Sequence, residues 1–273
     1  MNARLRLGLL LSSLLVAVAL LSLAWTPHDV GALALAERLQ PPSARHWLGT
    51  DQLGRDLLSL LMRGSATSLG VACVAVLLGA GLGVPLGLAA AARGGRLDEA
   101  LERGNDLVFA FPPLLLAVLL TATLGPGALN AILAVGMFNV PVFARITRGG
   151  ALPLLQREFV LAARTAGKTR GRIAREHVLP NLAGLLLVQL SIQLSLALLA
   201  ETGLSYVGLG TQPPQPSWGR TLADAQTLTA LAPTLALFTG AAIALAVLAF
   251  HLLGEGLRER LDPRRVTPPE ARP

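Results

Sequence analysis

The chain has one cysteine, few aromatic side chains and few charges. Only 14% of its residues are charged and 4% are aromatic, whereas 53% are apolar and the mean hydropathy is +0.59. The single cysteine, Cys73, can form no internal disulfide. Because this balance lies well outside that of soluble proteins, the shortages exclude an ordinary soluble domain and predict a membrane protein.

Six uncharged runs are long enough to cross about 30 Å of hydrocarbon as helices. They are residues 7–25, 64–92, 107–124, 128–144, 178–200 and 225–253. The third and fourth runs are short, and only Gly125-Pro126-Gly127 separates them, which leaves one over-long helix as the alternative. The sequence therefore predicts an all-α membrane protein with about six transmembrane helices.

Basic residues are distributed unevenly between alternate loops. If the N-terminus lies inside, 18 of the 23 Lys and Arg residues fall on the inner side. The other five are Arg38, Arg45, Arg55, Arg63 and Arg220. Because cytoplasmic loops carry the excess of Lys and Arg, we expect both termini and the loop 158–181 in the cytosol. The net charge of +7 then requires no nucleic acid, and we expect no nucleic-acid partner.

The first run has an alternative interpretation as a cleaved secretory signal, with Arg4 and Arg6 as its basic head and Ser22-Leu23-Ala24 as the cleavage site. Its apolar part is longer than the usual 7–15 residues of such signals. A retained helix also keeps the charge distribution consistent, so we expect a transmembrane span.

The loop 158–181 is a polar, helix-forming segment between two apolar runs. Its small residues allow another protein's backbone to come close, its arginines supply charge, and Pro180 is expected to stop the segment before the next run. Its candidate docking residues are Glu158, Ala162, Ala163, Gly167, His177, Leu179 and Pro180.

A second motif lies between the first two runs, on the expected outer side. Leucines 53, 57, 60 and 61 fall on one face at helical spacing, which predicts an amphipathic helix along the membrane surface. The motif residues are Gly49, Thr50, Asp51, Gly54, Arg55 and Asp56.

Both motifs resemble the permease subunits of ATP-binding-cassette (ABC) importers for dipeptides, oligopeptides and nickel. The loop resembles their EAA loop, and the string Gly-Thr-Asp-x-x-Gly-Arg-Asp resembles their outer segment. Three further blocks, at residues 106–114, 204–219 and 257–264, stand in the family's order, so the resemblance covers nearly all of 46–265. It implies a type I importer permease fold with a cytosolic coupling helix.

The resemblance also implies function and partners. It implies a transport subunit of a bacterial inner membrane that is not an enzyme and has no cofactor. Its partners would be a homologous second permease, two ABC ATPase subunits, an extracytoplasmic solute-binding protein and membrane lipid. The family's loop glutamate is replaced by Leu161, and Glu158, nearly one helical turn earlier, is the expected substitute. The rival interpretation is a scaffold or receptor whose basic loop binds anionic lipid.

Three segments organise the chain in this interpretation. Residues 1–63 hold the first span and the outer segment, 64–265 form the permease core, and 266–273 are a cytosolic tail. The compact length and the sequence at 156–161 favour a nickel or metal chelate slightly over a short peptide, whereas the block at 212–218 resembles the peptide branch.

Several features have a structural interpretation. Gly79, Gly83 and Gly87 form a flat face for close helix packing, either within the chain or against a partner permease. Pro112 and Pro113 indicate a hinge or a helix start. Trp218 is expected to anchor at the membrane interface, and Glu201 to be solvated at a span edge.

Two patterns suggest other chemistry and fail on inspection. The string from Ala162 to Thr169 is one glycine short of a phosphate-binding loop, and its place between two spans argues against nucleotide binding. The four histidines are far apart with no metal-ligand spacing, so we expect no metal site.

Overall fold

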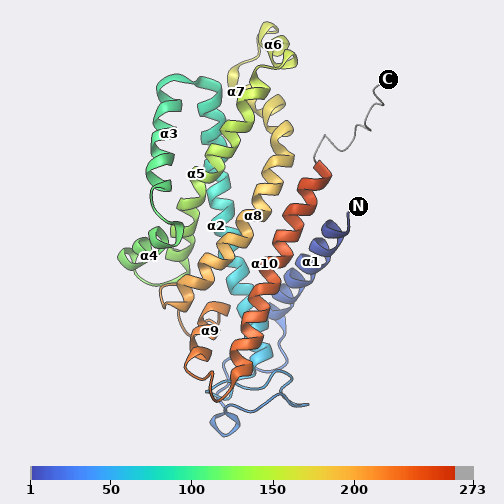
Figure 1. The fold of residues 1–273 in the computed structure, drawn as a ribbon, viewed down its shortest axis with the longest axis vertical. Helices are drawn as coiled ribbons and strands as arrows, with labels where there is room; N and C mark the ends of the chain where they lie inside the picture. The colour runs from blue at the N-terminus through green and yellow to red at the C-terminus, as the bar shows by residue number, and fades with distance from the viewer. Residues whose placement is uncertain (1, 262–273) are drawn as a thin grey trace, which may run out of the picture.

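The computed structural model describes residues 2–261, and within that range the chain is helical with no β-strand. Long helices run side by side along the longest axis of the molecule (Figure 1). They are α1 (Ala3–Ala24), α2 (Leu57–Arg93), α5 (Ala128–Leu155), α8 (Leu179–Tyr206) and α10 (Pro233–Leu261). This confirms the predicted all-α fold class.

Shorter helices connect or cap the long ones. They are η1 (Leu35–Glu37), α3 (Gly95–Phe109), α4 (Pro113–Leu124), α6 (Glu158–Thr165), α7 (Arg170–Ile173), the π-helical turn η2 (Ala174–Val178) and α9 (Trp218–Gln226). Residues 262–273 lie outside the described residues, and with them the predicted tail 266–273 and the last three residues of the block 257–264. The predicted boundary after residue 63 lies inside α2.

Among the described residues, five helices are long and apolar enough to cross a membrane, and a sixth span results if α3 and α4 count as one bent pair. The prediction of a single third span over 107–124 is wrong, because α3 and α4 meet at an angle of 87°. Pro112 has an extended backbone, with φ −57° and ψ 133°. A proline disfavours the helical conformation in the residue before it, so Pro113 accounts for the break.

Pro180 does not stop the loop segment as predicted. One continuous helical run extends from Arg170 to Tyr206 and includes α7, η2 and α8. Proline lacks a backbone N–H and clashes with the carbonyl four residues earlier in a regular helix. The π-helical turn directly before Pro180 relaxes this spacing, so the run continues through the proline.

Glycines permit two close helix contacts within the chain. A Cβ on Gly79 would lie 2.2 Å from the Asn139 Cβ, and a Cβ on Gly83 or Gly87 would lie 2.4 or 2.3 Å from a backbone oxygen of α5. The flat face on α2 therefore packs against α5 of the same chain. On the other side of the bundle, Gly8 of α1 and Gly256 of α10 allow those two helices to touch.

Trp218 is buried in the core, so the expectation that it anchors at the interface is wrong. Its indole Nε1 donates a hydrogen bond to the Leu61 carbonyl at 2.9 Å, and its backbone N–H donates to the Ser68 hydroxyl at 3.2 Å. The ring thereby joins the start of α9 to the first half of α2.

The outer segment between α1 and α2 is a folded loop, and the predicted amphipathic surface helix is absent from it. Gly54 has a φ of +74°, which breaks any helix before α2 starts at Leu57. Leu57, Leu60 and Leu61 do share a face, but that face is buried inside the bundle.

Candidate functional site

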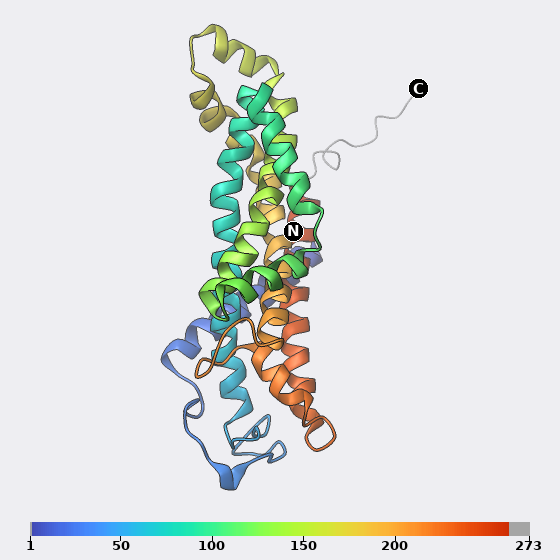
Figure 2. The same cartoon turned by 90° about the vertical axis from the view of Figure 1, so that its left-hand side faces the viewer.

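The two predicted motifs lie at opposite ends of the bundle. Figure 1 shows α6 and α7 at one end, beyond the start of α3, and α9 with the loop 25–56 at the other. Figure 2 shows the same separation after a quarter turn. The bundle itself keeps them apart, so any signal between them has to pass along the long helices.

Helix α6 forms the tip of the first end. Its inward face carries Val160 and Ala163, both buried, while Phe159 and Leu161 are 43% and 47% exposed. The ring of Phe159 also lies edge-on to the His177 imidazole, with 6.3 Å between the ring centroids. A short helix is thus held by its inner face and presents apolar side chains outward.

A polar cluster holds the connection from α6 into the long helical run. Lys168 Nζ and Arg172 Nε donate to the two carboxylate oxygens of Glu176 at 2.8 and 2.7 Å. Lys168 Nζ also lies 2.9 Å from His177 Nε2. The hydrogen bonds from Lys168 and then Arg172 lower the pKa of Glu176 to about 2. The carboxylate therefore stays charged at any physiological pH.

Gly167 ends α6 in the left-handed region, with a φ of +82°. Its N–H donates to the Arg164 carbonyl at 3.0 Å, and the Lys168 N–H donates to the Ala163 carbonyl at 3.1 Å, which satisfies the last carbonyls of the helix. A Cβ at Gly167 would meet nothing within 4 Å. The position faces open space in this chain.

The remaining predicted loop residues divide by exposure. Glu158, Ala162 and Pro180 are exposed, His177 and Leu179 are half-buried, and Ala163 faces inward. Sequence reasoning missed the exposed Phe159 and Leu161, because an apolar residue next to small ones gives no sign of which way it points.

The outer motif folds back on the segment before it. Thr50 Oγ1 donates to the Glu37 carbonyl and accepts from the Gln40 N–H at 2.8 Å. A Cβ on Gly49 would lie 2.5 Å from the Gln40 carbonyl oxygen, and one on Gly54 only 1.8 Å from that of Ala34. Both glycines also have positive φ. They are required by the close approach of two backbone segments.

The acidic residues of this motif accept hydrogen bonds from the loop and from the first turn of α2. Asp51 Oδ1 accepts from the N–H groups of Leu53 and Arg55 at 2.8 and 2.9 Å, and Arg55 Nε donates to Asp51 Oδ2 at 2.7 Å. Asp56 caps α2 by accepting from the Ser59 N–H at 2.8 Å.

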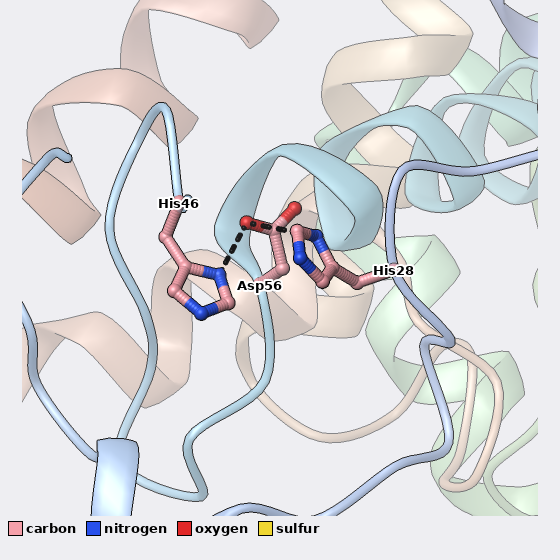
Figure 3. Close-up of side chains that lie close together, drawn as sticks. All are labelled: His28, His46 and Asp56. Carbon is pink, nitrogen blue, oxygen red and sulfur yellow. Dashed lines mark hydrogen bonds and ion pairs between the residues drawn. The ribbon is translucent and has the colours of Figure 1, made fainter. Parts of the chain in front are cut away.

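The histidines are not all far apart, contrary to the sequence expectation. Figure 3 shows His28 and His46 on either side of Asp56, with both rings turned toward its carboxylate. Burial raises the pKa of Asp56, but hydrogen bonds from Ser59 and His46 and the nearby His28 outweigh it and leave this pKa below its ordinary value. The loop brings together residues that are 10 and 28 positions apart in sequence.

A cavity of about 250 Å³ lies between α4, α5 and α8. Its wall is apolar except for Asn139 and Gln193, and the Gln193 Nε2 donates to the Asn139 Oδ1 at 2.5 Å. The other lining residues are Pro113, Leu114, Ala117, Val135, Phe138, Leu196, Ala197, Leu199 and Ala200. The Asn139 Nδ2 also donates to the Val135 carbonyl at 2.9 Å, so both polar atoms of Asn139 are hydrogen-bonded within the chain.

Glu201 is fully buried, so the expectation of a solvated edge acid is wrong. Its Oε1 accepts from the Ser205 hydroxyl at 2.7 Å. Ser205 Oγ in turn accepts from the Thr211 N–H at 3.0 Å, which joins α8 to the loop before α9. The network is structural support at the end of the bundle opposite α6.

Comparison with known proteins gives a consistent result. Residues 83–267 match the family described as the inner membrane component of binding-protein-dependent transport systems. The glutathione transport system permease protein GsiD of Pectobacterium atrosepticum is 40% identical over 92% of this chain and 84% of its own length. The dipeptide transport system permease protein DppC of Alkalihalophilus pseudofirmus is 38% identical over 94% of this chain and 84% of its own length.

The fold has a solved counterpart. An inward-facing structure of the MetNI methionine ABC transporter matches with a TM-score of 0.59 and 20% sequence identity, over 74% of this chain and 96% of the matched chain. At that identity the likeness concerns the fold alone. It agrees with the predicted importer permease fold.

Proposed function

The chain belongs to the family of inner membrane components of binding-protein-dependent transport systems, and from this premise we propose that α6 is the helix through which partner ATPases drive it. The chain is a multi-pass permease subunit of an ABC importer. Family membership disfavours the rival interpretation as a scaffold or receptor.

The exposed apolar side chains of α6, Phe159 and Leu161, are the observation that carries this proposal. Phe159 and Leu161 project from the tip while Val160 and Ala163 anchor it, and the charged cluster behind it is paired within the chain. An ATPase groove that receives α6 would bury apolar surface, and the paired charges of Lys168, Arg172 and Glu176 could stay behind the contact. Glu158, exposed in the first turn, is available for an arginine of the partner.

The continuous helix behind α6 supplies a route for the motion. Closure of two ATPase subunits would shift α6, and the run from Arg170 to Tyr206 would carry that shift to the outer end as a rigid lever. ATP hydrolysis belongs to the partner subunits in this mechanism. The permease would alternate between two packed states, each favoured by a different partner interaction.

Copurification tests the coupling role. The intact chain, expressed with the other subunits of its system, should bring down two ATPase subunits and a second permease. Phe159→Ser together with Leu161→Ser should reduce ATPase recovery by about tenfold, since two buried apolar contacts are lost. Arg103→Ser, on α3, is the control. Equal recovery from the double variant would remove α6 from the interface.

The same proposal places the α6 end and both termini in the cytosol. The charge asymmetry of 18 to 5 supports this orientation. Single cysteines at Thr169 and Gln215, in a Cys73→Ala background, should react with a membrane-impermeant reagent from opposite sides. Reaction of both from the outside would contradict the orientation.

We propose a short peptide as the cargo, delivered by an extracytoplasmic solute-binding protein. The relatives that carry glutathione and dipeptides in their names support it, and the cavity lined by Gln193 offers a place for such a ligand. The preference for a nickel chelate from length and residues 156–161 has no comparable support.

Gene deletion separates the two cargoes. Loss of this chain should abolish uptake of labelled dipeptide or glutathione and leave cellular nickel unchanged. A fall in nickel content with normal peptide uptake would overturn the peptide proposal. The variant Gln193→Leu should lower peptide uptake severalfold without changing ATPase recovery.

A further inference from the structure

We propose that His28, His46 and Asp56 form a binding site for a divalent transition-metal ion such as Zn²⁺ in the outer segment. Each residue offers one ligand atom, and the three atoms lie within 4.8 Å of one another. His28 follows α1, His46 lies in the folded loop, and Asp56 caps α2 (Figure 3). No role in the proposed transport mechanism uses these side chains.

Two of the three ligand distances are close to those of a first-row metal site, and the two histidine nitrogens lie within 4.8 Å of each other. Asp56 Oδ1 lies 3.0 Å from His46 Nδ1 and 3.7 Å from His28 Nδ1. Ligands about 2.1 Å from a tetrahedral zinc ion are about 3.4 Å apart, between these two values. Two imidazole nitrogens and one carboxylate leave the fourth position of a tetrahedral ion for water.

An unpartnered nitrogen of His28 indicates that the cluster lacks a ligand, because the ion would bind this atom directly. His28 Nδ1 and His46 Nε2 are buried and make no hydrogen bond. The His46 side chain is 3% exposed, so water does not readily satisfy it. An ion at the centre would use the lone pair of His28 Nδ1 directly and replace the proton that His46 Nδ1 shares with Asp56.

Glu37 lies behind His46 and would contact that histidine, not the ion itself. Its Oε2 lies 3.5 Å from His46 Nε2. When the metal takes Nδ1, the imidazole proton moves to Nε2 and points at this carboxylate. Hydrogen bonds from metal-bound histidines to carboxylates are the usual way that proteins fix the ring and raise its basicity.

The ion would fasten the outer segment to the bundle. It joins the segment after α1, the folded loop and the first turn of α2. The His46–Asp56 hydrogen bond and the bond from the His28 backbone N–H to Ser59 Oγ already link these segments at the same place. This places the site on the face that we assign to the outside, and the inference holds whatever the cargo is.

Metal titration of the whole chain tests the proposal. The full-length chain in nanodiscs, with its affinity tag removed, is stripped with a chelator and titrated with Zn²⁺ against a chromophoric competitor, and bound metal is counted by mass spectrometry. We expect one equivalent per chain. An excess of Mg²⁺ should not displace it, because Mg²⁺ prefers oxygen ligands.

Variants localise the binding. His28→Ala and His46→Ala should each weaken Zn²⁺ binding more than tenfold, and Glu37→Gln by about tenfold to 100-fold. His28→Ala keeps the His46–Asp56 hydrogen bond, so it reports on the metal even if His46→Ala folds poorly. His251→Ala, on α10, removes an exposed histidine elsewhere and should bind as the parent does.

The proposal fails on either of two results. One is a parent chain that binds less than about a tenth of an equivalent of Zn²⁺ at concentrations where the competitor is half saturated. The other is a His28→Ala variant that binds as tightly as the parent.

Discussion

The outer motif and the α6 tip are the two segments most readily recognised in the sequence, and they are built in opposite ways. In the outer motif the glycines touch backbone, and Asp51 and Asp56 accept hydrogen bonds from their own loop. At the tip, Gly167 faces open space and Phe159 and Leu161 are exposed. The glycines and aspartates of the first segment serve contacts within the chain, whereas the second segment presents surface.

The outer motif and the α6 tip both contain small and polar residues, but these residues serve different purposes in the two segments. A glycine with a backbone oxygen 1.8 Å from its missing Cβ is needed for folding, whereas one with nothing within 4 Å is free to serve a partner. The outer motif should therefore respond to substitution through stability, and the tip through transport.

The largest effect on stability should come from Gly54→Ala. The new Cβ would meet the Ala34 carbonyl oxygen at 1.8 Å at a φ of +74°, so the backbone has to move. We expect a loss of about 4 kcal/mol or more, enough to remove most folded chain from the membrane. Size-exclusion profiles of a fluorescent fusion measure it, with Gly31→Ala in the same segment as the control. Equal yields of the two variants would contradict a folding role.

A smaller loss is expected from Asp51→Ala. The change removes the acceptor for two backbone N–H groups and the partner of Arg55. Orphaned donors of this kind cost about 1–3 kcal/mol, which should lower the melting temperature by several degrees. Asp29→Ala is matched to it, since Asp29 accepts only the exposed bond from the Gly31 N–H. The comparison fails if Asp29→Ala is equally destabilising.

At the tip, Gly167→Leu should abolish transport with little loss of folded protein. Any side chain at a φ of +82° costs about 1 kcal/mol, so Gly167→Ala is the control that carries the same strain without the bulk. Leucine should hold α6 off its partner, and alanine should retain most activity. Uptake and ATPase recovery are measured together. Normal uptake with leucine would show that Gly167 does not face the partner.

The smallest effect should come from protonating Glu176. Its pKa is about 2 in the folded chain against an ordinary 4.5, so its contribution is complete above about pH 4.5 and is lost as the pH falls toward 2. A spin label at Thr165 in a Cys73→Ala background should gain mobility over that interval. Glu176→Gln should raise mobility at neutral pH, and Glu99→Gln on α3 should not. A label insensitive to both pH and Glu176→Gln would exclude this cluster as the tip's anchor.

Much of the architecture follows from local sequence. Uncharged runs of sufficient length have to form helices in a bilayer, because no water is present to satisfy the backbone. Five of the runs overlap α1, α2, α5, α8 and α10, although the last run is predicted to begin at Ala225, which lies in α9. The helix at Glu158–Thr165 also follows from local sequence, since the segment between the two spans is polar and helix-forming.

Tertiary structure decided what local spacing leaves open. Leucines 57, 60 and 61 share a face as the spacing predicts, but only the bundle shows that the face is internal. Gly79, Gly83 and Gly87 are flat in any fold, and the approach of α5 determines what they touch. The cluster of His28, His46 and Asp56 exists because one loop closes over the start of α2. Sequence spacing describes neighbours along one helix or strand, whereas these contacts join segments whose meeting depends on the whole fold.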